Sequence, residues 1–272
     1  MITKGLITQR ANEERLSAQT IERDYVLANL CADIGTAGDT RLVFKGGTLL
    51  RLCYFADYRY SADLDFSAVD GLSRAEATSL VADAIDTCRT RLELPVLEIV
   101  HGEGGTPWVS YVGPLGAKPR AIKLDISDAE LVASRTRINL QSRWPDLPDG
   151  AAIDGYTIDE VAAEKVRCIA ERVQCRDLYD MHQLLDADLV DPLDAWYLYL
   201  RKAENDRSRG RQRKSPREWF ATFERRVVAY QKRWESELGD YPPWGIPAFG
   251  DVERRCRRYL APLLDAARRI SE

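Results

Sequence analysis

The sequence is poor in the residues that usually build metal centres and disulfide frameworks. It has only two histidines, His101 and His182, and its six cysteines are scattered without a CxxC pair. A histidine-rich metal centre is therefore excluded, and the cysteines, which stand in apolar or helical contexts, are expected to be reduced core residues. No apolar run approaches the roughly 18 residues of a membrane span, and the polar N-terminus is unlike a signal peptide. We therefore expect a cytoplasmic protein with no membrane partner.

Charge is distributed unevenly along the 272 residues, a length that permits one large domain or two small ones. The net charge is −4, yet residues 200–272 hold 18 Lys and Arg against 11 Asp and Glu, whereas the remainder holds 21 against 32. A basic segment of this kind favours contact with a polyanion such as nucleic acid, although arginine-rich helices are more often solvated faces.

One stretch, Phe44–Phe66, combines two glycines with two aspartates and reads FKGGTLLRLCYFADYRYSADLDF. A short apolar run predicts a strand over Arg41–Phe44, and the glycine pair that follows permits a sharp turn with unhindered N–H groups. Thr48 is the expected N-cap of an apolar helix. Because the first N–H groups of a helix lack partners and lie at its positive end, Gly46, Gly47 and Thr48 are predicted to bind phosphate.

The second half of this stretch alternates polar and apolar residues with the period of a strand. Asp63 and Asp65 should therefore project from one face, where paired carboxylates suit Mg²⁺ or Mn²⁺. A DxD pair alone is most often a solvated strand or turn, but its combination with the glycine turn is more specific. A second alternating run, Ala121–Ser127, supplies Asp125 as a third carboxylate if the two strands lie side by side, as two-metal phosphoryl transfer requires.

The chain loses periodicity over Ser134–Gly150, and we place a domain boundary there, dividing residues 1–150 from 151–272. Beyond it, Thr157 is expected to cap a helix in which Lys165 and Arg172 stand two turns apart on one face. Both side chains are candidates for contact with a triphosphate or pyrophosphate. The alternative is a solvated face held by surface pairs such as Glu164–Arg167.

A further helix is predicted from Arg176, in the segment RDLYDM. Asp177 and Asp180 lie three residues apart and so share one face of a turn, although an N-cap is the commoner role for Asp177. The chain then reads as helices over 192–203, 216–238 and 251–270. An intervening arm without acidic residues is a candidate RNA-binding segment, or else a solvated loop; its basic residues include Arg207, Arg209, Arg211, Arg213 and Lys214. Trp219, Trp234 and Trp244 are expected in the core.

These motifs together resemble the AbiEii/AbiGii toxin-like nucleotidyltransferases of the DNA polymerase-β superfamily. The resemblance covers roughly residues 20–185 and rests on IERDYVL at 21–27, KGGT at 45–48, YSADLDF at 60–66, KLD at 123–125, AEK at 163–165 and RDLYD at 176–180. It implies an α+β fold: a catalytic domain with a small mixed sheet, followed by a helical domain that completes the NTP cleft and carries a basic acceptor surface.

The resemblance also implies roles for individual residues. Asp63, Asp65 and Asp125 would hold Mg²⁺ or Mn²⁺ and, with Lys165 and either Asp177 or Asp180, carry catalysis. The expected nucleotide-binding residues are Lys45, Gly46, Gly47, Thr48, Ser61, Lys165, Arg172 and Arg176. Characterised mycobacterial members of the family add nucleotides, often pyrimidines, to tRNA 3′ ends.

The resulting hypothesis is a toxin of a bacterial toxin–antitoxin pair that transfers a nucleoside monophosphate from an NTP to tRNA, releases pyrophosphate and blocks translation. Its expected partners are tRNA and a cognate antitoxin. One alternative moves the same group to a protein hydroxyl, on the toxin itself or its antitoxin. The other is a non-catalytic module that binds nucleic acid or a partner, against which the intact carboxylates argue.

Overall fold

The computed structural model describes residues 1–116, 118–141, 143–208, 210, 214–238 and 245–258. The chain divides into two compact units, Met1–Tyr156 and Thr157–Glu272. This division lies six residues beyond the boundary expected at residue 150. The difference arises because the strand Ala152–Tyr156 pairs with strands of the first unit.

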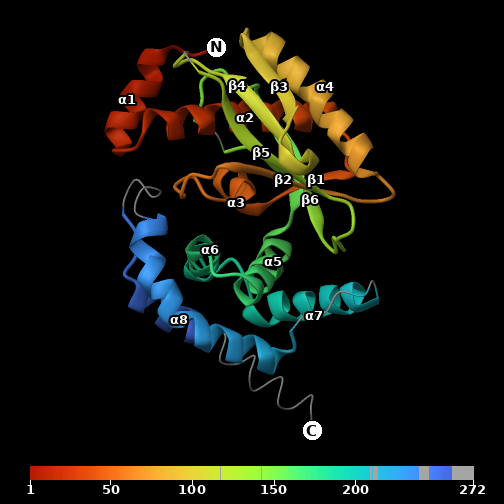
Figure 1. Ribbon diagram of the computed structural model, residues 1–272, viewed down its shortest axis with the longest axis vertical. Helices are drawn as coiled ribbons and strands as arrows, with labels where there is room; N and C mark the ends of the chain where they lie inside the picture. Colours follow the sequence, from red (N-terminus) through yellow and green to blue (C-terminus); the bar gives the residue numbers. More distant parts are fainter. Residues whose placement is uncertain (117, 142, 209, 211–213, 239–244, 259–272) are drawn as a thin grey trace. The chain divides into compact units, whose positions relative to one another are not determined.

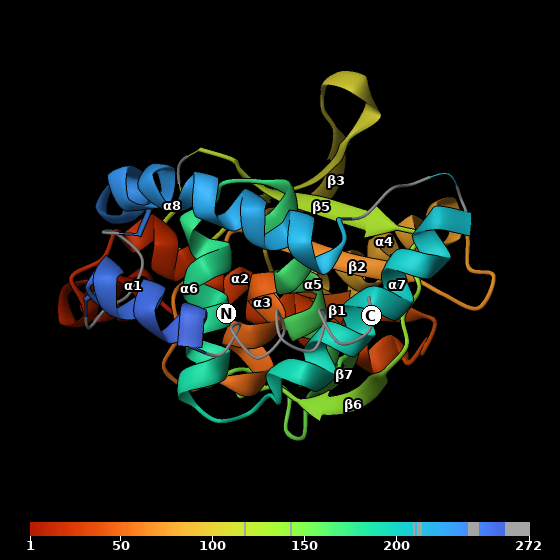
Figure 2. The same ribbon diagram turned by 90° about the horizontal axis from the view of Figure 1, so that it is seen from below.

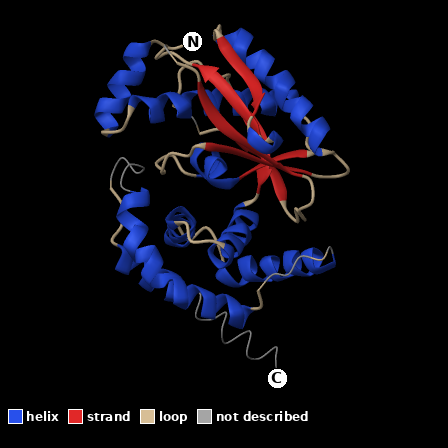
Figure 3. Cartoon of the chain, viewed as in Figure 1, coloured by secondary structure: helices blue, strands red, loops and turns tan. Residues whose placement is uncertain are grey.

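The first unit is built on a mixed β-sheet, shown in red in Figure 3. Within the described residues the sheet has seven strands in the order β3-β4-β5-β2-β1-β7-β6. Their bounds are β1 (Leu42–Lys45), β2 (Asp63–Ala68), β3 (Val96–His101), β4 (Pro107–Val112), β5 (Arg120–Ser127), β6 (Arg135–Asn139) and β7 (Ala152–Tyr156). The β2–β5 and β1–β7 pairs are parallel, and the other neighbours are antiparallel. In Figure 2, β5, β2, β1, β7 and β6 follow one another across the sheet.

The helices of this unit are α1 (Lys4–Glu14), α2 (Ala18–Ala37), the short α3 (Gly46–Leu49) and α4 (Arg74–Leu92), with a π-helical turn at Leu50–Tyr54 and a 3₁₀ turn at Glu103–Gly105. Three of the four described α-helices of this unit, α1, α2 and α4, begin at a residue whose side chain caps the helix. Ser17 caps α2, and Ser73 and Glu76 form the predicted capping box at the start of α4. Helices α2 and α4 pack against each other and against the sheet (Figure 1).

Strand β6 and helix α1 lie in segments whose sequences have no clear apolar periodicity. The edge strand β6 has four of its five residues exposed, so it lacks the alternation of a half-buried strand. It is held instead by pairing with β7, where Arg137 donates to Asp154 over 2.7 Å. The polar helix α1 buries only Ile7 and Ala11. The predicted β3–β4 hairpin is confirmed.

The second unit is helical in all its described elements: α5 (Ile158–Glu171), α6 (Cys175–Asp186), α7 (Pro192–Ser208), α8 (Pro216–Leu238) and helical residues 249–258. Trp219 of α8 is fully buried, and its Nε1 donates to Val166 O over 2.7 Å, which ties α8 to α5. Trp234 is also in the core, whereas Trp244 and the expected helix end at residue 270 lie outside the described residues. The α+β fold expected from the sequence is confirmed.

The expectation about the cysteines agrees with the structure. All six cysteines are free and buried, as expected for reduced core residues. Burial raises the pKa of their thiols, for example to about 12 at Cys53 and about 11 at Cys168. Within the described parts of the chain, no helix is both long and apolar enough to cross a membrane.

Candidate functional site

One polar row crosses three neighbouring strands of the first unit. Lys45 on β1 stands opposite Asp65 on β2, which stands opposite Asp125 on β5. Residues directly opposite each other on paired strands place their side chains on the same face. The predicted Asp125 strand therefore meets the condition for Asp125 to join the aspartate pair, because it lies beside the DxD strand. Asp63 shares this face one step along β2, opposite Lys123.

The other face of the same strands explains why the carboxylates point where they do. Leu64, Phe66 and Leu124 alternate with the aspartates and are fully buried in the core. By contrast, Asp63 and Asp65 are half-buried and the Asp125 side chain is 55% exposed. Burial of the apolar face thus fixes the register and presents the carboxylates on the accessible face.

The chemistry of these donors fits a hard divalent cation. Asp65 and Asp125 lie in register on adjacent strands, and all three candidate ligands offer oxygen atoms. Among the described residues, no group of three or more His, Cys, Asp and Glu side chains is placed so that it could hold a metal ion by itself. A cation here would therefore take few protein carboxylates and fill its shell with phosphate oxygens and water, as Mg²⁺ commonly does.

The glycine turn lies directly against this carboxylate row. Gly46 has a φ of +82°, a left-handed conformation that favours glycine, and a Cβ at this position would collide with Asp65 Oδ2. At Gly47 a Cβ would lie 2.5 Å from Arg59 Nη2 and 3.3 Å from Ser61 Oγ. The positive φ and the close carboxylate thus favour glycine at position 46, and the turn brings its backbone beside a carboxylate and a guanidinium.

Thr48 does not cap the helix, contrary to the sequence-based prediction. Helix α3 begins at Gly46 with Lys45 as its N-cap, and no side chain makes the capping hydrogen bond. Thr48 is buried inside the helix, where its hydroxyl donates to Asp63 O over 2.5 Å. This bond ties α3 to the start of β2 and so positions the first aspartate. The π-helical turn then ends at Tyr54, with Phe55 outside it.

Arg59 is a site residue that the sequence reasoning missed. Its side chain is buried, and its guanidinium lies beside Gly47 and Ser61. Arg59 Nη1 also approaches Tyr60 O at 3.5 Å. A buried arginine so close to a glycine turn provides fixed positive charge with fork geometry, which suits phosphate. Its position two residues before Ser61 was the feature in the sequence that could have indicated it.

A framework of buried polar contacts holds the segment before β2 in place. Arg51 donates to Asp24 of α2 over 3.1 Å and to Tyr58 O over 3.0 Å, and it stacks on the Tyr60 ring at 4.0 Å. Tyr60 in turn donates to Glu14 of α1 over 2.5 Å. The conformation of the segment carrying Arg59 and Ser61 therefore depends on α1 and α2, where the opening motif of the sequence lies.

Lys45 has a partner that no spacing in the sequence indicated. Its ammonium pairs with Glu130 in the loop after β5. Ser67 Oγ also donates to Glu130 over 3.0 Å, and Ser67 is itself 2.8 Å from the Tyr156 hydroxyl. Glu130 therefore anchors the lysine on the same face as Asp65, and only the folded chain brings these residues together.

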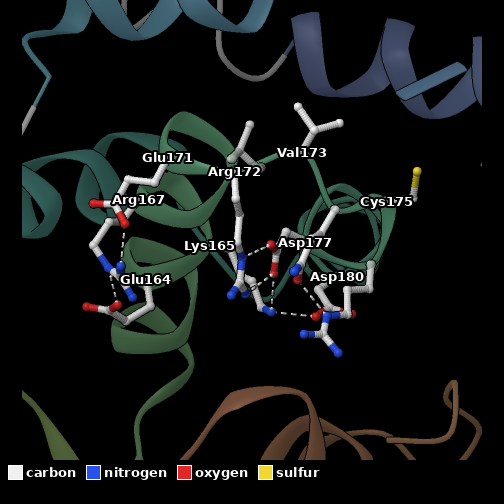
Figure 4. A network of polar contacts seen from close by, with 12 residues as sticks. Glu164, Lys165, Arg167, Glu171, Arg172, Val173, Cys175, Asp177 and Asp180 are labelled. Carbon is white, nitrogen blue, oxygen red and sulfur yellow. Dashed lines mark hydrogen bonds and ion pairs between the residues drawn. The ribbon is translucent and has the colours of Figure 1, made fainter. Parts of the chain in front are cut away.

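The second unit contains its own cluster of predicted site residues, shown in Figure 4. Lys165 of α5 lies between two carboxylates of α6, with Nζ 3.0 Å from Asp177 Oδ1 and 2.6 Å from Asp180 Oδ2. All three side chains are buried. Arg172, at the end of α5, adds contacts of 2.8 and 3.2 Å to Asp177. Lys165 and Arg172 thus both contact Asp177, although Arg172 lies one residue beyond the end of α5, in extended backbone, and not on the helix face where the sequence placed it.

Burial raises the pKa of the Asp177 carboxyl, but the charges of Lys165 and Arg172 outweigh burial and hold it below its ordinary value. Asp177 is not an N-cap, because α6 begins at Cys175 and its N-cap is Gln174. Arg176 donates to the Gln174 side chain over 2.9 Å.

The surface pairs offered as an alternative for α5 are also present, without excluding the Lys165 cluster. Glu164 accepts from Arg167 over 2.7 Å, and Arg167 also pairs with Glu171 at 2.6 Å.

The candidate RNA-binding arm is described only at its ends. Arg207 belongs to α7, and Lys214 donates to Ala170 O over 2.5 Å. The other predicted residues of the arm, Arg209, Arg211 and Arg213, lie outside the described residues.

Comparisons with known proteins agree with this arrangement. The model of a family described as nucleotidyl transferase AbiEii toxin, type IV toxin–antitoxin system, matches residues 33–254. A search of curated protein sequences finds no match.

Two solved structures share the fold. MenT4, a nucleotidyltransferase toxin from Mycobacterium tuberculosis H37Rv, is 23% identical, with a TM-score of 0.72 over 99% of this chain and 93% of that chain. JHP933 from Helicobacter pylori is 18% identical, with a TM-score of 0.55 over 94% of this chain and 96% of that chain. At these identities the likeness shows the fold alone.

Proposed function

Because the chain belongs to the AbiEii family of nucleotidyl transferase toxins of type IV toxin–antitoxin systems, we propose that it transfers a nucleoside monophosphate from an NTP to the 3′ end of tRNA and so blocks translation. The family also implies a cognate antitoxin as partner. The observation that carries the proposal is the register of Asp65 and Asp125 on adjacent strands, directly beside the Gly46–Gly47 turn. The name of the structural neighbour MenT4 describes the same chemistry and supports the proposal.

In the proposed reaction, the oxygen of the acceptor hydroxyl attacks the α-phosphorus and forms a new P–O bond. The bond from that phosphorus to the oxygen bridging to the β-phosphate breaks, and pyrophosphate leaves with the electron pair. The hydroxyl proton passes to Asp125 or to water. Such a reaction has a transition state with spread negative charge, so its catalysis rests on positioning and electrostatic stabilisation.

Different residues of the first unit are proposed to bind the phosphates and the metal ion. Gly46 and Gly47 present backbone N–H groups to the β- and γ-phosphates, and the buried guanidinium of Arg59 offsets their charge. Asp63, Asp65 and Asp125 would hold Mg²⁺ or Mn²⁺, which when bound supplies positive charge to the phosphoryl oxygens.

In the second unit, Lys165 and Arg172 are proposed to interact with the triphosphate or the leaving pyrophosphate. Asp177 and Asp180 orient them, because both carboxylates contact the Lys165 ammonium and Asp177 also binds Arg172. A pair of fixed cations at the leaving group favours its departure.

The acceptor is proposed to be RNA because the C-terminal residues 200–272 carry 18 Lys and Arg against 11 Asp and Glu. Basic side chains neutralise backbone phosphates without choosing a sequence. A protein hydroxyl on the toxin or its antitoxin is the second candidate acceptor. A pyrimidine preference, which the family implies, and a cytoplasmic location are also part of the proposal.

An Asp65→Ala variant tests the chemistry. It removes the carboxylate that lies between Lys45 and Asp125, so NMP transfer should fall by at least about 10³-fold. The matched control is Asp86→Asn, which changes an exposed aspartate on α4 and should leave transfer unchanged. Transfer would be measured with labelled NTPs and total RNA in Mg²⁺ and after chelation. Near-normal turnover by a folded Asp65→Ala protein would overturn the proposal.

The acceptor is tested separately by incubating the protein with each labelled NTP, with and without total RNA. Sequencing RNA 3′ ends afterwards would identify the acceptor and the added base together. Label that is lost on RNase treatment supports the RNA acceptor. Label that stays with protein after RNase treatment favours the protein acceptor instead.

A further inference from the structure

A small pocket lies along β5 on the side of Asp125 that faces away from Asp65. It has a volume of about 230 Å³, and its walls include Arg74, Gly104–Pro107 and Lys123–Ile126. Because β4 and β2 flank β5 on opposite sides, the start of β4 places this pocket beyond Asp125 from the DxD strand. All its walls belong to the first unit.

The pocket occupies a stretch of β5 that a neighbouring strand would otherwise cover. β4 pairs with β5 from Arg120 to Lys123. The stretch Leu124–Ile126 lies beyond the last of these pairs and lines the pocket instead, together with the turn before β4. Glycines 104 and 105 in that turn have no atom within 4 Å of a Cβ position, so the turn leaves room for a ligand.

Two cations of the pocket are held only loosely by the protein. Arg74 Nη2 lies 3.8 Å from Asp128 Oδ1, and Lys123 Nζ lies 3.4 Å from Asp125 Oδ2. The Arg74 and Lys123 side chains are 63% and 41% exposed. Exposed ion pairs of this length stabilise a protein by about 0–1 kcal/mol. An anionic ligand can therefore replace Asp128 and Asp125 as the partner of Arg74 and Lys123.

We propose that this pocket receives the ribose and phosphate of the 3′-terminal nucleotide of a polynucleotide acceptor, with the phosphate at Arg74 and Lys123 and the ribose hydroxyl at Asp125. This inference rests on the proposed function and adds the place of the acceptor. In phosphoryl transfer the attacking and leaving oxygens lie roughly in line on opposite sides of the phosphorus. The Gly46–Gly47 turn lies on the β1 side of Asp65, and the pocket lies on the β4 side of Asp125.

The size of the pocket agrees with this occupant. Its volume of about 230 Å³ lies below the roughly 300–1,000 Å³ of sites for drug-sized ligands. A ribose with its phosphate fits such a site, whereas the remainder of an RNA would extend outside it.

The test uses the full chain with Arg74→Gln, Lys123→Gln and the conservative Arg74→Lys. The matched control is Arg89→Gln, an exposed arginine on the same helix with a carboxylate partner of its own. Transfer kinetics would be measured on a short single-stranded RNA with a free 3′ hydroxyl, at several salt concentrations. Binding of the same labelled RNA would be followed by fluorescence anisotropy, which does not depend on turnover.

Arg74→Gln and Lys123→Gln should each raise the KM and Kd for RNA about tenfold, as expected for loss of a hydrogen bond to a charged group. Each variant should also lower the slope of log Kd against log salt concentration by about 1, the value for one phosphate contact. The KM for NTP should stay unchanged. Arg74→Lys should keep most of the affinity, and Arg89→Gln all of it. Unchanged RNA binding and salt dependence in the Gln variants, in a protein that labels RNA, overturns the pocket and leaves the proposed function standing. A wild-type protein that labels no RNA overturns both.

Discussion

Replacement of Gly46 by alanine tests how strictly the glycine turn is coupled to the carboxylate row. Gly46 has a φ of +82°, and Gly71, in the turn before α4, has a φ of +81°. An alanine in this conformation costs about 1–2 kcal/mol at either site. The two variants should therefore lose similar backbone stability, which chemical denaturation would measure.

The two glycines differ in what a side chain would meet. At Gly71 no atom lies within 4 Å of a Cβ, whereas at Gly46 the Cβ would collide with Asp65 Oδ2. Gly46→Ala must therefore push the carboxylate or the turn aside by a distance on the order of 1 Å, and misplacement of that size can cost about 10²-fold in rate. Gly71→Ala should transfer NMP at the wild-type rate. The coupling of turn to carboxylate is refuted if both variants, folded and at equal concentration, retain equal activity.

Two further predictions concern the second unit. Lys165→Met leaves Asp177 and Asp180 buried without their shared cation. The free energy of unfolding, measured by urea titration, should therefore fall by about 3–5 kcal/mol. A loss below about 1 kcal/mol, typical of an exposed pair, would contradict this account. Burial and the charge of Arg255 lower the pKa of His182 to about 4 from its ordinary 6.5. As pH falls, the unfolded chain therefore binds a proton at this histidine before the folded chain does, and the free energy of unfolding should decline between about pH 6.5 and 4. His182→Gln should flatten that decline. An unchanged slope of the free energy of unfolding against pH would contradict this prediction.

The sequence predicts the parts of the site that depend on local patterns. Alternation around Asp63 and Asp65 predicts a strand and its polar face, and the same reasoning predicts a strand around Asp125, although only the fold shows that the two strands are neighbours. The helix segments around Lys165 and Asp177 were likewise readable, because spacing along a helix fixes which side chains share a face. In each case the spacing of polar and apolar residues along the chain determines both the type of element and the direction of its side chains.

The residues that were missed act through contacts between distant segments. Glu130 reaches Lys45 across 85 positions of the chain, and no periodicity relates them. Arg59 is placed by the framework of Arg51 and Tyr60, whose partners lie on other helices. Thr48 was assigned a cap because threonine at a helix start usually is one. In the fold, the helix begins three residues earlier, with Lys45 in place of Thr48 as its N-cap, and the Thr48 hydroxyl donates to the Asp63 carbonyl instead.

The two polar clusters depend on different features of the fold. Lys165 lies on α5, and Asp177 and Asp180 lie on the next helix, α6. The packing of these two consecutive helices therefore sets the geometry of the cluster. Asp65 and Asp125 meet only if β2 and β5 pair in one register, and a shift by one residue would turn either aspartate toward the core. That register is enforced by burial of Leu64, Phe66 and Leu124 on the opposite face. The apolar face of the sheet is therefore as much a determinant of the chemistry as the carboxylates, because its burial keeps them on a common surface.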